Sequence, residues 1–132
     1  MIKEMTEKEY NFFFLMGKFF ASRKFIKEMD CQLYSNEDML WYIYFNKEGK
    51  ICGFASLEDN EKYSMLDNFL VLEEYRNKGI GKEILDHIVN DVMEKDIRLI
   101  SRNPIAIKMF KERGFEITGH NGRYEKMIKK IK

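Results

Sequence analysis

The sequence predicts an α+β fold, in which a central mixed but mostly antiparallel sheet carries helices on both of its faces. Three observations indicate this fold. Aromatic and β-branched segments separated by short turns fill residues 39–72, which is typical of an antiparallel meander. A strand, an amphipathic helix and another strand follow one another over residues 63–101, as in a parallel crossover. A further helix and a pair of strands are expected after residue 101.

The first part of the chain is expected to contain a short edge strand over residues 2–5 and two helices. Thr6 and Glu9 have the spacing of a capping box, which predicts a helix over residues 6–20. A serine can cap a second, shorter helix over residues 22–29. A polar, loop-like stretch follows.

The middle of the chain predicts three strands. Residues 39–45 and 51–57 are rich in apolar, aromatic and β-branched side chains, and the turn between them, 46–50, indicates a hairpin. A second turn near residues 58–61 leads into a third strand over residues 63–72.

The last part of the chain continues with a helix from Ile80, whose apolar residues recur at the helical period. A strand is expected over residues 97–101, and Asn103 is a suitable N-cap for the next helix. Strands over 115–118 and 123–128, joined by a turn, complete the expected sheet.

Composition limits the function. We expect one domain over residues 1–132, because a chain of this length can bury roughly two-thirds of its unfolded surface around one core. A net charge of +1 argues against a general nucleic-acid binder. No apolar run reaches membrane-spanning length and nothing resembles a secretory signal, so a cytoplasmic protein with no membrane partner is expected. Cys31 and Cys52 lack metal-ligand spacing, and no metal is expected.

The turn before the Ile80 helix has the composition of an anion-binding site. Its glycines let the backbone approach a ligand, and the first N–H groups of the helix have no partners within it. The positive end of the helix dipole and three basic side chains add favourable charge. We therefore expect a phosphate or pyrophosphate here. The residues of the turn are Arg76, Asn77, Lys78, Gly79, Ile80, Gly81 and Lys82.

This turn differs from two named phosphate-binding motifs. A Walker A loop would need a glycine at Arg76 and Ser or Thr at Glu83, and a dinucleotide fingerprint would need a glycine at Ile84. The turn therefore matches neither a Walker A loop nor the dinucleotide fingerprint. The spacing R-x-x-G-x-G resembles the coenzyme A pyrophosphate loop of the GNAT superfamily, the acyl-CoA-dependent N-acyltransferases. The alternative is a helix start that merely uses glycines in its turn.

A second motif supports the same resemblance. Asn103, Ala106, Phe110 and the pair Gly114-Phe115 are similar to the GNAT signature N-x-x-A-x-x-x-Y-x-x-x-G-F, and they follow the first motif in the required order. The resemblance covers about residues 50–128. It implies the GNAT fold, in which two central strands splay apart and the acyl-pantetheine arm lies between them.

The resemblance also implies a co-substrate, acetyl-CoA, and residues that bind it. The loop from Arg76 to Lys82 would hold the pyrophosphate, and Asn103 would contact the pantetheine arm, with a pure helix cap as the alternative for Asn103. Phe110 would pack against the pantetheine arm or the core. The pantetheine amides and the oxyanion would bind backbone groups of Phe69, Leu70 and Val71.

The catalytic side chains depart from the family pattern. The position that commonly holds a glutamate is Met65, and Asp67 lies two residues on, on the same side of an ideal strand. With Met65, Phe69 and Val71 as its neighbours on that face, desolvation would raise the pKa of Asp67 and make it a general base. The alternative is a salt-bridged or solvent-facing aspartate.

The usual tyrosine general acid is replaced by Phe110. Either the thiolate takes its proton from water or Tyr124 on the last strand substitutes, although Tyr124 is also readily explained as core filler.

Together these features predict an N-acetyltransferase that moves an acetyl group from acetyl-CoA to a primary amine of a small molecule or peptide. Its acceptor site would lie between the N-terminal helices and the turn 119–122, in a monomer or homodimer. A non-catalytic acyl-CoA-binding module and a protein-interaction domain of the same fold are the alternatives.

Overall fold

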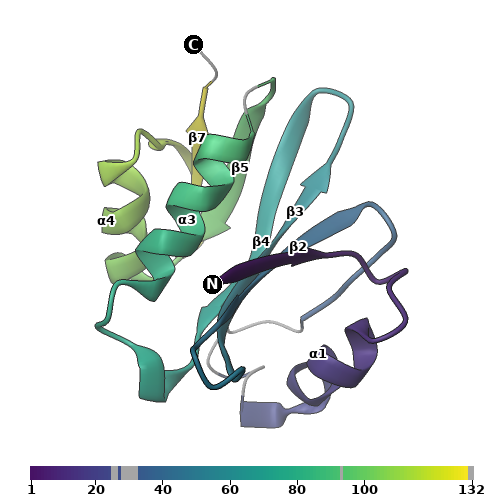
Figure 1. Ribbon diagram of the computed structural model, residues 1–132. Coiled ribbons are helices and arrows are strands. Elements are labelled where there is room, and N and C mark those ends of the chain that lie inside the picture. The colour runs from purple at the N-terminus through teal and green to yellow at the C-terminus, as the bar shows by residue number, and fades with distance from the viewer. Residues whose placement is uncertain (25–26, 28–32, 93, 131–132) are drawn as a thin grey trace.

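The computed structural model describes residues 1–24, 27, 33–92 and 94–130. Within these residues, seven strands form one sheet in the order β1-β2-β3-β4-β5-β7-β6 (Figure 1). All neighbours pair antiparallel except β4 and β5, which are parallel. The strands are β1 (Ile2–Met5), β2 (Met39–Phe45), β3 (Ile51–Asp59), β4 (Tyr63–Val71), β5 (Asp96–Ser101), β6 (Glu116–Asn121) and β7 (Tyr124–Lys129).

Helices cover both faces of the sheet, so the α+β prediction is confirmed. Helices α3 (Ile80–Asp91) and α4 (Pro104–Glu112) lie on one face, and α1 (Phe12–Ala21) lies on the other (Figure 1). A short 3-10 turn, η1 (Glu73–Tyr75), connects β4 to the loop before α3.

The prediction for the first helix was wrong at its start. The helix begins at Phe12 rather than at residue 6, and Asn11 is its N-cap. The pair Thr6 and Glu9 closes a separate turn, in which the Thr6 N–H donates to Glu9 Oε1 at 3.4 Å and the Glu9 N–H donates to the Thr6 carbonyl at 3.1 Å. A capping pair can stabilise a single turn without nucleating a helix. The second helix, predicted over 22–29, lies largely outside the described residues.

The turn predicted over residues 119–122 is also shorter than expected. Strand β6 continues to Asn121, and the reversal occurs at Gly122, whose φ of 64° suits a glycine. Because the turn is tight, the pairing of β6 with β7 extends to Asn121 and Tyr124. The polar composition of residues 118–121 did not indicate this strand extension.

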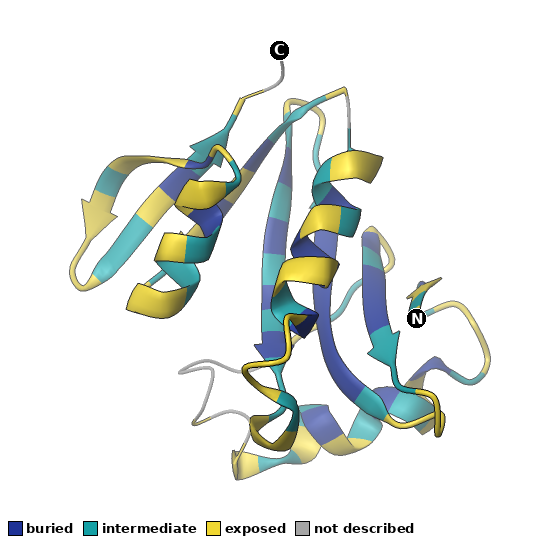
Figure 2. Ribbon diagram, turned by 60° about the vertical axis from the view of Figure 1, so that its left-hand side comes forward, coloured by how far each residue is buried: buried dark blue, intermediate teal, exposed yellow. Residues whose placement is uncertain are grey.

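Two apolar clusters fill the space between the sheet and the helices (Figure 2). On one face, α3 buries Ile84, Leu85 and Ile88 against the sheet, as its apolar spacing predicts. On the other face, Phe12 and Phe19 of α1 belong to the second cluster, which also contains Trp41 and Phe54. Each fully buried side chain of this size contributes about 1.5–3 kcal/mol, so the two clusters fix both helix layers on the sheet.

Strand β4 contains a bulge at Asn68. Asn68 has a φ of 53°, and the pairing between β3 and β4 shifts between Phe54 and Ser56. Leu66 and Phe69 both pack against the α3–α4 cluster, although strict alternation would place residues three apart on opposite faces. The bulge therefore separates Asp67 from the face of Phe69 and Val71, which corrects the surroundings predicted for Asp67.

Close approach of β3 to β4 next to the bulge requires a glycine. A Cβ on Gly53 would lie 2.9 Å from the Leu70 carbonyl oxygen and 3.3 Å from Val71 Cα, both of them backbone atoms. Any side chain at this position would push the end of β4 away from β3.

We therefore expect Gly53→Ala to lower the free energy of unfolding by about 1–3 kcal/mol, since the new methyl group overpacks the backbone. Gly17→Ala is the matched control, because Gly17 lies within α1 and a Cβ there meets nothing within 4 Å. The control is expected to stabilise the protein by about 0.5–1 kcal/mol. Urea unfolding of both variants measures these changes in the free energy of unfolding. If Gly53→Ala were as stable as wild type, the close approach of β3 to β4 would not require a glycine.

Candidate active site

The two central strands diverge and leave one edge of β4 open. Parallel pairing joins Tyr63 to Asp96 and ends at Met65 and Arg98. Beyond this point β4 runs on to Val71 and β5 to Ser101 without pairing to each other (Figure 2). The peptide groups on this edge of Phe69, Leu70 and Val71 therefore have no strand partner among the described residues, and such an edge can accept another extended chain.

The phosphate loop brings the positive end of α3 to this opening. Gly79 is the N-cap of α3 with a φ of 82°, and Asn77 has a φ of 65°. Residues 76–79 are exposed. The side chain of Lys78 lies over the ring of Tyr75, with Nζ 5.7 Å from the ring centroid. The helix start thus presents unpartnered N–H groups within a basic surface.

Arg76 fixes the loop to the end of β4. Its Nε donates a hydrogen bond of 2.9 Å to the carbonyl oxygen of Val71. This contact explains why an arginine suits the position even before any ligand binds, because a planar guanidinium can bond the strand end and still carry charge. The exposed Lys82 extends the basic surface into the first turn of α3.

Gly81 is not required by the fold. Its φ is not positive, and a Cβ there would meet Val71, Phe69 and Met109 at ordinary contact distances of 3.4–3.7 Å. Without a side chain, Gly81 leaves the backbone of the first turn of α3 open to close approach by a ligand.

Asn103 caps α4. Its Oδ1 accepts hydrogen bonds from the Ile105 N–H at 2.9 Å and from the Ala106 N–H at 3.3 Å. The helix-cap interpretation is confirmed, and a contact between Asn103 and a cofactor stays a prediction.

Phe110 is buried in the core beneath the opening, with 3 % of its surface exposed. Its ring meets Phe69 edge to face at 5.8 Å and Phe115 at 5.6 Å. Because Phe69 belongs to the open edge of β4, Phe110 supports the wall of the opening from α4. It has no proton to give to a leaving group.

Asp67 lies on the opposite side of β4 from Phe69. Its Oδ2 accepts a hydrogen bond of 2.7 Å from the hydroxyl of Tyr34. Burial raises the pKa of the carboxyl group, the negative charge of Glu58 raises it further, and the hydrogen bond from Tyr34 opposes the shift. The predicted direction and its main cause, burial, are confirmed, whereas the expected apolar neighbours Phe69 and Val71 lie on the other side of the strand.

Tyr124 lies near the open end of β5. The residue after it, Glu125, pairs with Ser101, which is the last residue of β5. The guanidinium of Arg102 lies 5.8 Å from the Tyr124 ring centroid. A role for Tyr124 as proton donor stays a prediction.

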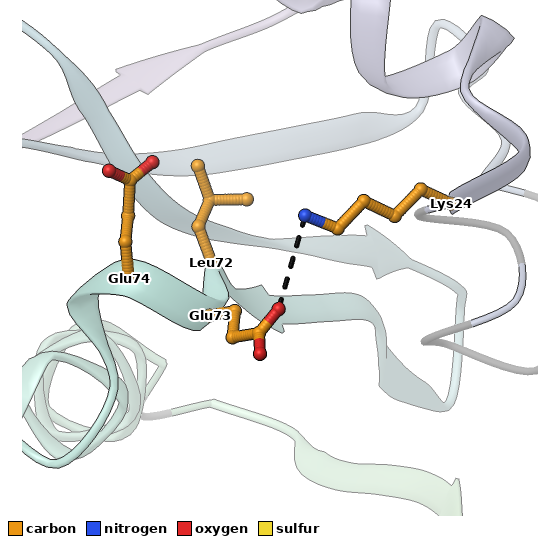
Figure 3. A pocket seen from close by; sticks show the side chains of 4 residues that line it. All are labelled: Lys24, Leu72, Glu73 and Glu74. Carbon is orange, nitrogen blue, oxygen red and sulfur yellow. Dashed lines mark ion pairs between the residues drawn. The ribbon is translucent and has the colours of Figure 1, made fainter.

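A hollow of about 420 Å³ follows directly on the end of β4 and is lined by Lys24, Leu72, Glu73 and Glu74 (Figure 3). The Glu73 and Glu74 carboxylates point to different sides, and Lys24 Nζ lies 3.9 Å from Glu73 Oε2. Such an exposed ion pair contributes little to stability.

The sequence predictions missed Tyr34 and Asn68 as site residues. Tyr34 stands in a polar loop and contacts β4 across 33 residues of sequence, so no local pattern identifies it. Among the other reactive side chains, Cys52 is fully buried. His87 contacts Glu4 at the surface, and His120 contacts Glu125 there.

No helix in the described part of the chain is long and apolar enough to cross a membrane.

Comparison with known proteins identifies the family. The family model described as Acetyltransferase (GNAT) family matches residues 2–115. The chain belongs to this family. The resemblance of the two sequence motifs is thereby confirmed, and the family supports acyl transfer as the general reaction.

Solved structures share the GNAT fold at low identity. ElaA from Escherichia coli has a TM-score of 0.79 at 11% identity, covering 98% of this chain and 99% of that chain. PaiA N-acetyltransferase from Thermoplasma acidophilum, in complex with coenzyme A, has a TM-score of 0.67 at 16% identity, covering 98% and 99%. A GNAT family acetyltransferase from Elizabethkingia anophelis with acetyl-CoA bound has a TM-score of 0.70 at 14% identity, covering 99% and 97%. None of the curated proteins matches the chain.

Proposed function

We propose that the protein is an N-acetyltransferase that transfers an acetyl group from acetyl-CoA to a primary amine of a small molecule or peptide. The observation that carries this proposal is the open edge of β4, which leads directly to the exposed start of α3. An extended arm with amide groups fits the edge, and its diphosphate fits the helix start. Coenzyme A is such a molecule, and two solved structures of the same fold contain coenzyme A or acetyl-CoA.

In this proposal the backbone of β4 performs the binding and charge stabilisation. The backbone of Phe69, Leu70 and Val71 pairs with the pantetheine amides in the manner of a strand, through groups on the open edge other than the Val71 carbonyl oxygen, which accepts from Arg76. A backbone N–H of the same edge donates to the thioester oxygen as negative charge develops on it. The loop from Arg76 to Lys82 holds the pyrophosphate.

Asp67 is the proposed general base. Its carboxylate takes a proton from the acceptor ammonium, and the neutral amine attacks the thioester carbonyl carbon. A C–N bond forms, the attacking nitrogen releases its second proton to water, and the C–S bond breaks. The departing thiolate takes a proton from water or from Tyr124. A base with a raised pKa is better matched to this proton transfer than an ordinary aspartate.

The second candidate function is a non-catalytic acyl-CoA-binding module. Phe110 favours it, because this buried ring occupies the place of the tyrosine that commonly protonates the thiolate in the family. Thiol release from acetyl-CoA across a panel of primary amines separates the two functions. An enzyme releases thiol only with an acceptor, and a module releases none.

Acetyl-CoA should stabilise the folded protein through the phosphate loop. At a hundredfold excess over Kd, we expect a gain of about 2.7 kcal/mol, since the ligand binds only the folded state. Gly79→Ala should remove most of this gain, because the added Cβ strains the backbone at the helix start. Thermal unfolding with and without acetyl-CoA measures the difference.

Gly49→Ala is a matched control for this experiment. Gly49 has a φ of 79° against 82° for Gly79, and a Cβ at either position meets nothing within 4 Å. Both variants should lose about 1–2 kcal/mol of stability through the strained conformation. Only Gly79→Ala should lose the response to acetyl-CoA, and an equal response in both variants would exclude the loop as the binding site.

Asp67→Asn tests the general base. The wild-type kcat/KM should fall as the pH drops through the raised pKa of Asp67, because only the ionised carboxylate accepts a proton. The variant should lose this acid limb and about 100-fold in kcat/KM. Its stability should not fall at neutral pH, because a pKa raised by folding means that the ionised form destabilises the folded state there.

Asp38→Asn, in an exposed turn, serves as the control and should keep the wild-type pH profile. The base assignment is wrong if Asp67→Asn keeps both its rate and its acid limb.

A further inference from the structure

Every residue of the segment Leu33–Asn36, called the tyrosine segment below, is fixed to the sheet. Leu33 is buried in the α1-side cluster with 2 % of its surface exposed. The hydroxyl of Ser35 accepts a hydrogen bond of 3.1 Å from Trp41 Nε1. The side-chain amide of Asn36 donates to Glu58 Oε2 at 2.8 Å. The segment lies outside regular secondary structure, yet each of its side chains has a defined partner.

Asn68 fixes the backbone of Tyr34 at the bulge of β4. The Tyr34 N–H donates to Asn68 Oδ1 at 3.2 Å, and Asn68 Nδ2 donates to the Tyr34 carbonyl at 3.0 Å. Asn68 Nδ2 also donates to Ser56 Oγ at 2.7 Å, and Asn68 is 5 % exposed. A buried amide with its donors and acceptor used holds its neighbours in one arrangement. The bulge thus determines where the Tyr34 side chain can reach.

The Tyr34 hydroxyl reaches one oxygen of Asp67 and leaves the other available. The hydrogen bond goes to Oδ2 at 2.7 Å, and no other described residue bonds Oδ1. Among the described residues, the titratable groups that face this carboxylate are Tyr34 from the tyrosine segment and Glu58 from β3. They act in opposite directions, since a donated hydrogen bond favours the ionised form and a nearby negative charge disfavours it.

We propose that Tyr34 is a positioning residue, which holds Asp67 with its free carboxylate oxygen directed at the acceptor amine. This inference rests on the proposed acetyltransferase function. It adds the tyrosine segment to β4 as a part of the chain that forms the acceptor site. The amine proton moves to Asp67 Oδ1, while Oδ2 stays bonded to Tyr34. Tyr34 lowers and Glu58 raises the pKa of the base, so the pair sets the pH at which the site works.

Carboxyl titration by ¹³C NMR tests the inference without substrate. In Tyr34→Phe the Asp67 carboxyl should titrate at a higher pH than in wild type, because the ionised form loses its hydrogen bond. In Glu58→Gln it should titrate at a lower pH. Asn68→Gly keeps the positive φ of the bulge but removes both bonds to the Tyr34 backbone, and should shift the titration in the direction of Tyr34→Phe.

Tyr63→Phe is the matched control. Tyr63 is half-buried on the same strand, and its ring lies 4.1 Å from the guanidinium of Arg98, a contact that phenylalanine retains. The control should leave the Asp67 titration unchanged. The inference is overturned if Tyr34→Phe titrates like wild type, or if Tyr63→Phe produces the same shift.

Kinetics separates failure of this inference from failure of the proposed function. With an amine that supports turnover, Tyr34→Phe should lower kcat about tenfold, move the acid limb of kcat/KM upward, and leave KM for acetyl-CoA unchanged. Turnover that is unaffected in Tyr34→Phe but lost in Asp67→Asn would overturn the inference alone. Full turnover in Asp67→Asn would overturn the base assignment and the inference together, whatever the NMR titration shows.

Discussion

Within the described part of the chain, strand β4 has a strand partner on one side only beyond Met65, and the rest of the candidate site depends on this constraint. Peptide groups left without partners on a sheet edge favour pairing with an added extended chain. Gly53 lets β3 hold the end of this strand closely, and Arg76 bonds its last carbonyl oxygen. Helix α3 begins immediately afterwards, so an unpaired edge and a positively polarised helix start lie next to each other.

The bulge at Asn68 gives the two sides of β4 different chemistry. Phe69 and Val71 pack toward α3 and α4 and form an apolar wall with Phe110 behind it. Asp67 and Asn68 instead contact Tyr34, and burial raises the pKa of Asp67 there. One extra residue in a strand therefore places a candidate base and a candidate cofactor surface on a common backbone, a few residues apart.

Much of this could be predicted from sequence, because the signals are local. The glycines and cations of residues 76–82, the apolar stripe of α3 and the N-cap Asn103 act within a few residues, and the structure confirms the elements they predict. The helix start at residue 6 failed because a capping pair specifies a turn, whereas the length of α1 depends on packing of Phe12 and Phe19 against the sheet.

The tyrosine segment and the bulge could not be predicted for a different reason. Residues 69–72 form a continuous apolar run, so alternation gives no sign that an extra residue interrupts the strand. Tyr34 meets Asp67 only through the tertiary fold, and its neighbours carry no motif. The face assigned to Asp67 was therefore wrong, while the direction of its pKa shift was right because burial occurs on either face.

The most direct test of the account is a crystal structure of the protein with acetyl-CoA. The account predicts the pantetheine arm along the open edge of Phe69–Val71, with the pyrophosphate at the N–H groups from Gly79 to Lys82. An acetyl-CoA molecule bound elsewhere, or a crystal in which these N–H groups stay without ligand at saturating acetyl-CoA, would contradict it.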